Sequence, residues 1–216
     1  MALKEAKYIL IIVGLLTLAG FWIFWPLGLL AVGMLIFVLW FFRDPQRDIP
    51  QEPGMIVSAA DGKVVRVDET DEIYFSDQPM KRVAVFLSVF DVHINRTPYE
   101  SKLIDNHHHA GEFLDARDPQ CDIKNEAFNW LFQTDRGNIV VRQIAGLIAR
   151  RICPWKTPGA AMQRGEPFGM IKFGSRTDVF LPLDCEICVR EGERVKGGET
   201  VIARFPDQSG TDTAQG

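Results

Sequence analysis

The sequence has no excess of positive charge, few cysteines, and no charged residue at all between positions 8 and 42. Its formal net charge is −4, and because polyanion-binding proteins are usually basic, nucleic acid is not expected as a partner. A hydrophobic content of 47%, with only 18 glycines and 12 prolines, excludes a disordered or collagen-like chain. The 216 residues therefore predict one folded domain with an apolar segment attached to it.

The cysteines do not form a complete metal-binding pattern. Cys185 and Cys188 are spaced as a CxxC, but no second CxxC accompanies them, and Cys121 and Cys153 stand alone. The CxxC lies in a stretch typical of a strand, where residues three apart face opposite sides. We therefore expect packed thiols, and a cytoplasmic location predicts that they stay reduced.

The uncharged run at 8–42 is 35 residues long, so one straight helix would reach roughly 52 Å, against a hydrocarbon core of about 30 Å. Pro26 and Gly28 lie at its centre, and a break there predicts a transmembrane helical hairpin rather than one tilted span. A cleaved signal peptide is the alternative, but the run is too long for its apolar region and lacks a convincing cleavage site. Basic residues flank the run at both ends: Lys4, Lys7, Arg43 and Arg47. The positive-inside rule then places both ends in the cytoplasm.

Residues 43–54 (RDPQRDIPQEPG) are polar and proline-rich, and they predict a linker between an anchor at 1–42 and a domain at 55–216. In that domain, short segments rich in Val, Ile and Phe alternate with Gly, Asp and Pro, which is typical of strands. The expected strands cover 55–57, 62–67, 82–90, 138–143, 179–181, 186–191 and 200–204. Residues 143–151 are open to a short helix instead. Because long helical patterns are absent, we expect a mainly β (α+β) domain.

The C-terminal stretch carries a regular glycine rhythm. Valines and glycines alternate every three residues at Val189, Gly192, Val195, Gly198 and Val201. This spacing is typical of barrel-sandwich-hybrid domains of the lipoyl type, where glycines make tight turns between short strands. No lysine stands at a hairpin tip in a carrier context, so the rhythm indicates a fold and not a biotinyl or lipoyl carrier.

Three local segments carry groups capable of chemistry: AADGKV at 59–64, FLSVFDVHINRTP at 86–98 and GMIKFGSRTDVFLP at 169–182. Taken singly, each is as well explained by a turn or a structural side chain. Together they supply Asp61, His93 and Ser175, that is, a carboxylate, an imidazole and a hydroxyl. These are the groups with which proteins activate a serine.

In this order, and with AGEFLDARD at 110–118 and Asn125-Glu126 between them, the segments resemble the phosphatidylserine decarboxylase family in its short, archaeal-type form. The resemblance implies a self-processing, pyruvoyl-dependent enzyme. Ser175 would attack the carbonyl of Gly174, and the resulting ester would undergo β-elimination to a dehydroalanine that hydrolyses to a pyruvoyl group and ammonia. The products would be a β-chain of residues 1–174 and an α-chain of residues 175–216, held together as a heterodimer.

The implied reaction converts phosphatidylserine in the bilayer to phosphatidylethanolamine and CO2, through a Schiff base between the substrate amine and the pyruvoyl group. No metal is implied. The implied location is the cell membrane, with the catalytic domain on the cytoplasmic side. A phosphate-bearing head group calls for cationic side chains, and the sequence does not choose among Lys63, Arg96, Lys172 and Arg176.

Two departures from the family's long form leave the base for self-cleavage open. The long form has a second histidine three residues after the first, where this chain has Arg96 beyond His93. Either His93 serves as base for processing and as acid for protonation, with Asp61 as its orienting partner, or processing relies on strain and local hydrogen bonds. The long form also has threonine after the cleavage serine, where this chain has Arg176, which we interpret as a subfamily difference.

Two other function classes remain as alternatives. A membrane-anchored zinc hydrolase would use His93, His107 and His109, but no HExxH motif accompanies them. Adjacent histidines on a strand alternate faces, so within His107-His108-His109 only the outer two could share a metal. A non-catalytic membrane adaptor is the other alternative. The sequence leaves the oligomeric state open, a homo-oligomer included.

Overall fold

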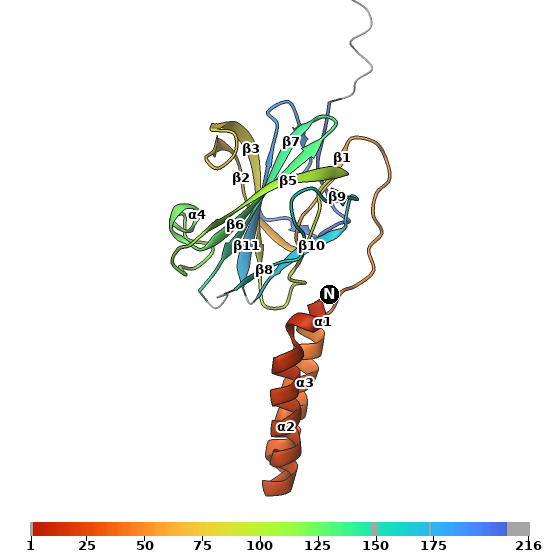
Figure 1. The fold of residues 1–216 in the computed structure, drawn as a ribbon, viewed down its shortest axis with the longest axis vertical. Helices are drawn as coiled ribbons and strands as arrows, with labels where there is room; N and C mark the ends of the chain where they lie inside the picture. The colour runs from red at the N-terminus through yellow and green to blue at the C-terminus, as the bar shows by residue number, and fades with distance from the viewer. Residues whose placement is uncertain (1, 148–150, 173, 207–216) are drawn as a thin grey trace, which may run out of the picture. The chain divides into compact units, whose positions relative to one another are not determined.

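A computed structural model describes residues 2–147, 151–172 and 174–206 (Figure 1). The chain divides into two compact units. The first comprises residues 1–46 together with 89–92, and the second comprises residues 47–88 together with 93–216. The boundary after residue 46 lies inside the segment that the sequence predicts as a linker.

The first unit consists mainly of helices: α1 (Ala2–Glu5), α2 (Lys7–Ile23) and α3 (Trp25–Phe41). Phe24 separates α2 from α3 with an extended backbone, and Pro26 stands in the first turn of α3, where a proline costs no intrahelical hydrogen bond. The two long helices pack side by side (Figure 1), so the predicted break at the centre of the apolar run is confirmed. Large apolar side chains face outward, Trp22 being 93% exposed. Within the part of the chain described, no helix meets the length and apolarity needed to cross a membrane.

The second unit is built on one curled sheet of eight antiparallel strands, in the order β13-β2-β3-β11-β7-β6-β5-β9 (Figure 1). These strands are β2 (Gly62–Glu72), β3 (Gln78–Leu87), β5 (Ser101–His109), β6 (Ala127–Thr134), β7 (Gly137–Ala145), β9 (Ala161–Met162), β11 (Ser175–Leu181) and β13 (Arg194–Val195). β11 lies inside the sheet, paired with β3 on one side and β7 on the other.

Two three-stranded sheets complete the unit, in the orders β1-β14-β12 and β4-β10-β8. Their strands are β1 (Met55–Val57), β4 (Ile94–Arg96), β8 (Ile152–Pro154), β10 (Pro167–Ile171), β12 (Glu186–Ile187) and β14 (Val201–Arg204), and one short helix, α4 (Cys121–Lys124), precedes β6. Apolar side chains from the large sheet, β1, β10 and β14 form one buried core. At its centre the Phe168 ring packs edge-on against Trp130 and Phe132.

The mainly β prediction is confirmed, and β1 has the expected bounds. The helix considered for 143–151 is wrong over its first residues, because β7 continues to Ala145; residues 148–150 lie outside the described part. β6 was missed because its burial does not alternate strictly: Trp130 and its neighbour Asn129 are both buried. The strand expected at 82–90 ends at Leu87.

Candidate active site

Ser175 is the first residue of β11, and its backbone is fixed from both sides by pairing with Leu87 and Ala145. Its side chain is completely buried, and its Oγ has no hydrogen-bond partner among the described residues. An unpaired buried hydroxyl costs free energy, and proteins keep such groups mainly where a function uses them. The arrangement suits a nucleophile that is not tied up in a structural bond.

Gly174 precedes Ser175 in a left-handed conformation, with φ +66°, which a glycine adopts without steric cost. Its carbonyl oxygen lies against the backbone of Gly146, the residue that follows β7. A Cβ placed on Gly146 would stand 2.4 Å from that oxygen. The carbonyl that a serine nucleophile would attack is thus seated where only glycine leaves room for it.

His93 stands immediately before β4 and is fully buried. Its Nε2 accepts a hydrogen bond from the backbone N–H of Gly174 at 3.2 Å. A ring nitrogen that accepts a hydrogen bond carries no proton in that arrangement. Pairing of β4 with β10, together with a bond from the Ile171 N–H to the His93 carbonyl, holds the histidine here. The structure therefore brings His93 to Gly174, the residue whose carbonyl belongs to the Gly174-Ser175 peptide.

A chain of buried amides ties the histidine segment to the serine strand. The Asn95 side chain donates to Thr177 Oγ1 at 2.9 Å and to the Ala59 carbonyl at 3.3 Å. It accepts from Gln143 Nε2 at 2.6 Å, and Gln143 in turn accepts from the Trp130 indole at 2.8 Å. Since Thr177 lies two residues beyond Ser175, both side chains point to the same face of β11.

Asp61 has a different set of partners. Both carboxylate oxygens accept from Arg47 at 2.9 Å, and one also accepts from the Gly197 N–H at 2.8 Å. These bonds fasten the turn before β2 to the chain beyond β13. They give Asp61 a structural role, and its part in self-cleavage stays a prediction.

Arg176 points to the opposite face of β11 from Ser175 and is pinned there. Its guanidinium binds Asp178 through two bonds of 2.7 Å and also binds Asp122, and it contacts Cys121 Sγ at 3.1 Å. Burial, against the opposing charge of Arg176, raises the pKa of the Cys121 thiol to about 12. The Cys121 thiol is therefore neutral. The buried ion pairs of Arg176 with Asp178 and Asp122 hold the start of β11 in place.

The other candidate head-group cations differ in accessibility. Arg96 is buried and donates to the Gly165 carbonyl at 2.9 Å, and Lys172 is partly buried two residues before Gly174. Lys63 is exposed and lines a cavity of about 540 Å³ with Phe86, Arg117 and others. Lys63 pairs with Phe86, and Phe86 pairs with Arg176. Because paired residues share one face of a sheet, Lys63 lies on the face of Arg176, opposite to Ser175.

The histidine triplet lies on β5, where His107 and His109 flank the Tyr74 ring and His108 meets Glu126. Among the described residues no three metal-ligating side chains gather. The CxxC is split: Cys185 is buried and Cys188 is exposed.

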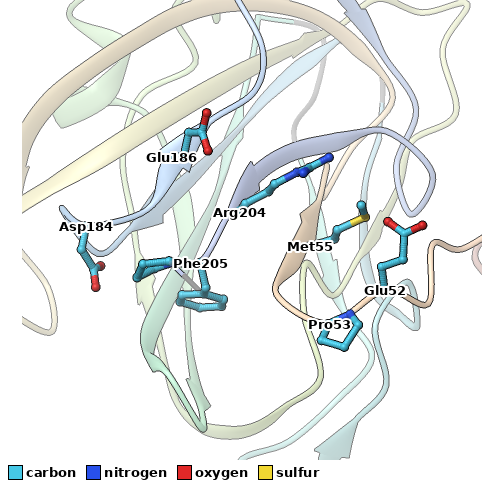
Figure 2. Close-up of a pocket in the computed structure, with 8 residues that line it drawn as sticks. Glu52, Pro53, Met55, Asp184, Glu186, Arg204 and Phe205 are labelled. Carbon is cyan, nitrogen blue, oxygen red and sulfur yellow. The ribbon is translucent and has the colours of Figure 1, made fainter. Parts of the chain in front are cut away.

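A further cavity, of about 380 Å³, lies beside the β1-β14-β12 sheet, and Figure 2 shows the residues that line it. Its polar lining combines Glu52, Asp184 and Glu186 with Arg204. None of the three predicted site residues lines it, so the buried serine and histidine remain the candidate active site.

A family model described as phosphatidylserine decarboxylase matches residues 34–203, a span that contains Asp61, His93, Gly174 and Ser175. The chain belongs to the phosphatidylserine decarboxylase family. Three relatives bear the name phosphatidylserine decarboxylase proenzyme. The one from Symbiobacterium thermophilum is 46% identical over 90% of this chain and 91% of its own length. The relative from Carboxydothermus hydrogenoformans is 40% identical over 94% of this chain and 95% of its own length. The relative from Syntrophus aciditrophicus is 44% identical over 79% of this chain and 80% of its own length.

Membership of the phosphatidylserine decarboxylase family confirms the resemblance predicted from the three segments. Sequence reasoning missed Gly146, Asn95 and Gln143. Asn95 could have been predicted as a site residue, because it lies in the FLSVFDVHINRTP segment two residues after His93. No local sequence pattern distinguishes Gly146 or Gln143 from other residues.

Proposed function

We propose that this protein decarboxylates phosphatidylserine to phosphatidylethanolamine and CO2, after cleaving itself between Gly174 and Ser175. One arrangement is the main support for this proposal. The Ser175 hydroxyl is buried and has no hydrogen-bond partner among the described residues, and it follows Gly174, which is left-handed and donates its N–H to His93. The family and the proenzyme relatives support the same reaction.

Self-cleavage begins when Ser175 Oγ attacks the Gly174 carbonyl carbon. His93 is the proposed base, and its Nε2 takes the hydroxyl proton once it releases the Gly174 N–H. The peptide nitrogen leaves the carbon, takes up a proton and becomes the free amine of an ester-linked Ser175. Loss of the Ser175 α-proton and of the Gly174 carboxylate leaves a dehydroalanine. Its imine tautomer takes up water and releases ammonia. The remaining group is a pyruvoyl at the start of the α-chain, 175–216, and the β-chain, 1–174, ends in a carboxylate.

The residues present fit a pyruvoyl group formed in place, because the serine that would become it is buried and held by two neighbouring strands. Such a group supplies a ketone that condenses with an amine and withdraws electrons as CO2 leaves. The protein's own part is to exclude water at β11 and to hold the His93 ring at the reacting end of the strand. His93 is also the proposed proton donor to the product carbon, with Asp61 as its proposed orienting residue.

The α- and β-chains are proposed to stay together as a heterodimer after cleavage. β11 belongs to the α-chain, and both of its neighbours, β3 and β7, belong to the β-chain. β13 and β14 pair likewise with β2 and β1. Separating the chains would expose the core that these strands share, which supports a barrel-sandwich-like domain assembled from both chains.

The α2–α3 hairpin is the proposed membrane anchor, with both ends and the catalytic domain on the cytoplasmic side of the cell membrane. Each helix has 17 residues, about 26 Å, which is shorter than a hydrocarbon core of about 30 Å, so the proposed anchor requires its flanking residues or a locally thinner bilayer. The outward apolar side chains and the flanking lysines and arginines support this assignment.

The test of the proposed function is replacement of the serine. Ser175→Ala is expected to give one uncleaved chain that releases no CO2 from phosphatidylserine, whereas the natural protein gives two chains and is inactivated by hydroxylamine. Ser101→Ala is the matched control, because Ser101 Oγ is also buried without a hydrogen-bond partner among the described residues. A chelator should leave the activity intact. Normal cleavage of Ser175→Ala contradicts the proposal.

A further inference from the structure

The loop at 89–92 belongs to the same compact unit as the apolar helices, although it lies nearly fifty residues further along the chain. Two contacts at the end of α3 make this connection. The Phe90 ring packs edge-on against Trp40 with 6.3 Å between centroids, and Arg43 donates from Nη2 to the Phe90 carbonyl at 3.1 Å. Phe90 is nevertheless 67% exposed.

The residues around Phe90 have the composition of a membrane interface. Phe37 packs against Trp40 at 6.2 Å, and the Arg43 guanidinium stands 3.8 Å from the centre of the Trp40 ring. Tryptophan and arginine prefer the head-group layer, where an aromatic ring stays in apolar surroundings and a charge stays wet. The three rings of Phe37, Trp40 and Phe90 are all partly or largely exposed and continue the apolar surface of the helices.

We propose that Phe90 inserts into the head-group layer of the bilayer and acts as a second membrane contact beside the helical hairpin. The proposal rests on the membrane anchoring in the proposed function. Phe90 precedes His93 by three residues, at most about 11 Å of extended chain. A short stretch of chain therefore joins the loop to His93.

Spin labelling of the full-length protein in phosphatidylcholine–phosphatidylglycerol vesicles tests the position of the loop without any substrate. Cys188→Ser removes the exposed thiol and leaves Cys121, Cys153 and Cys185, which are buried. In this background a nitroxide is attached at Phe90→Cys or, as control, at Leu183→Cys, an exposed apolar position of the second unit. The Phe90 label is expected to be more accessible to oxygen than to a water-soluble nickel chelate, and the Leu183 label the reverse.

Two failures of this experiment are distinguishable. A protein that floats with the vesicles while its Phe90 label reacts like the Leu183 label contradicts the loop proposal alone. A protein that does not float contradicts the anchor on which it rests. Self-cleavage, read from a denaturing gel, reports separately on the proposed function.

The kinetic consequence is tested with Phe90→Asp. Its kcat/KM is expected to fall about tenfold on phosphatidylserine in vesicles, because a charge opposes insertion, and to stay unchanged on short-chain, monomeric phosphatidylserine. Leu183→Asp should change neither value. Equal losses of Phe90→Asp on the two substrates, or no loss on vesicles, overturn the proposal.

Discussion

At the scale of single residues, the site depends on how closely atoms approach the Gly174-Ser175 bond. The Gly174 oxygen touches the Gly146 backbone, and His93 touches the Gly174 N–H. The first contact places the carbonyl of the bond that would be broken, and the second holds the glycine that carries this carbonyl. We infer that self-cleavage is controlled by the placement of the carbonyl as much as by activation of the hydroxyl.

Gly146→Ala is expected to slow self-cleavage by at least about 100-fold, since its methyl group would displace the Gly174 carbonyl by a substantial part of an ångström. The measurement is the fraction of cleaved chain against time on a denaturing gel. Gly33→Ala, where a Cβ meets nothing within 4 Å, should cleave normally. Normal cleavage of Gly146→Ala would show that this contact does not position the carbonyl.

At the scale of strands, the site exists because β4 and β11 are held in one alignment. Asn95 on β4 reaches Thr177 on β11, and Gln143 on β7 completes the connection. Asn95→Leu should leave Gln143 and Thr177 with unpaired buried groups, at a cost of about 1–3 kcal/mol in the free energy of unfolding.

The same Asn95→Leu variant should also cleave more slowly at a temperature where it is fully folded, as judged by circular dichroism. Asn138→Leu, at an exposed position, is the control for replacing an asparagine. Loss of stability with an unchanged cleavage rate would limit Asn95 to a structural role.

The opposite face of β11 is held by the ion pairs of Arg176 and Arg82 with Asp122. Burial alone would raise the pKa of Asp122, but the charges and hydrogen bonds of the two arginines lower it below its ordinary value. A lowered pKa in the folded state contributes stability that is present above the unfolded pKa, about 3.9, and is lost as the pH falls through the folded value.

Asp122→Asn is therefore expected to lower the free energy of unfolding by about 2 kcal/mol at pH 7, because Arg66, Arg82 and Arg176 lose a partly buried partner. The difference from the parent protein should shrink below about pH 4, where the parent carboxylate also becomes protonated. Urea unfolding measures this difference in free energy, and a Ser175→Ala background keeps the protein as one uncleaved chain. A difference that is independent of pH would contradict the ion-pair explanation.

At the scale of the whole molecule, the sequence predicted what local patterns encode. The mainly β domain, the break in the apolar run and the family followed from periodicity, Pro26 and three short segments. Contacts between distant segments were out of reach: nothing near Gly146 indicates that it meets Gly174, and nothing near Phe90 indicates that it meets Trp40. Such contacts are set by sheet order and packing, which a single sequence does not reveal.

The interleaving of strands also decides how the two proposed chains behave. Because β11 is paired on both sides by strands of the β-chain, cleavage breaks one covalent bond without removing a sheet neighbour. We expect the cleaved chains to remain together in native buffer and to separate only under denaturing conditions.

The most direct test of the central claim is the intact mass of the purified protein under denaturing conditions. The account predicts a chain of residues 1–174 and a chain of residues 175–216, the second lighter by one ammonia than the same peptide beginning with serine and reactive towards a hydrazide. A single uncleaved chain that lacks carbonyl reactivity and still releases CO2 from phosphatidylserine would contradict it.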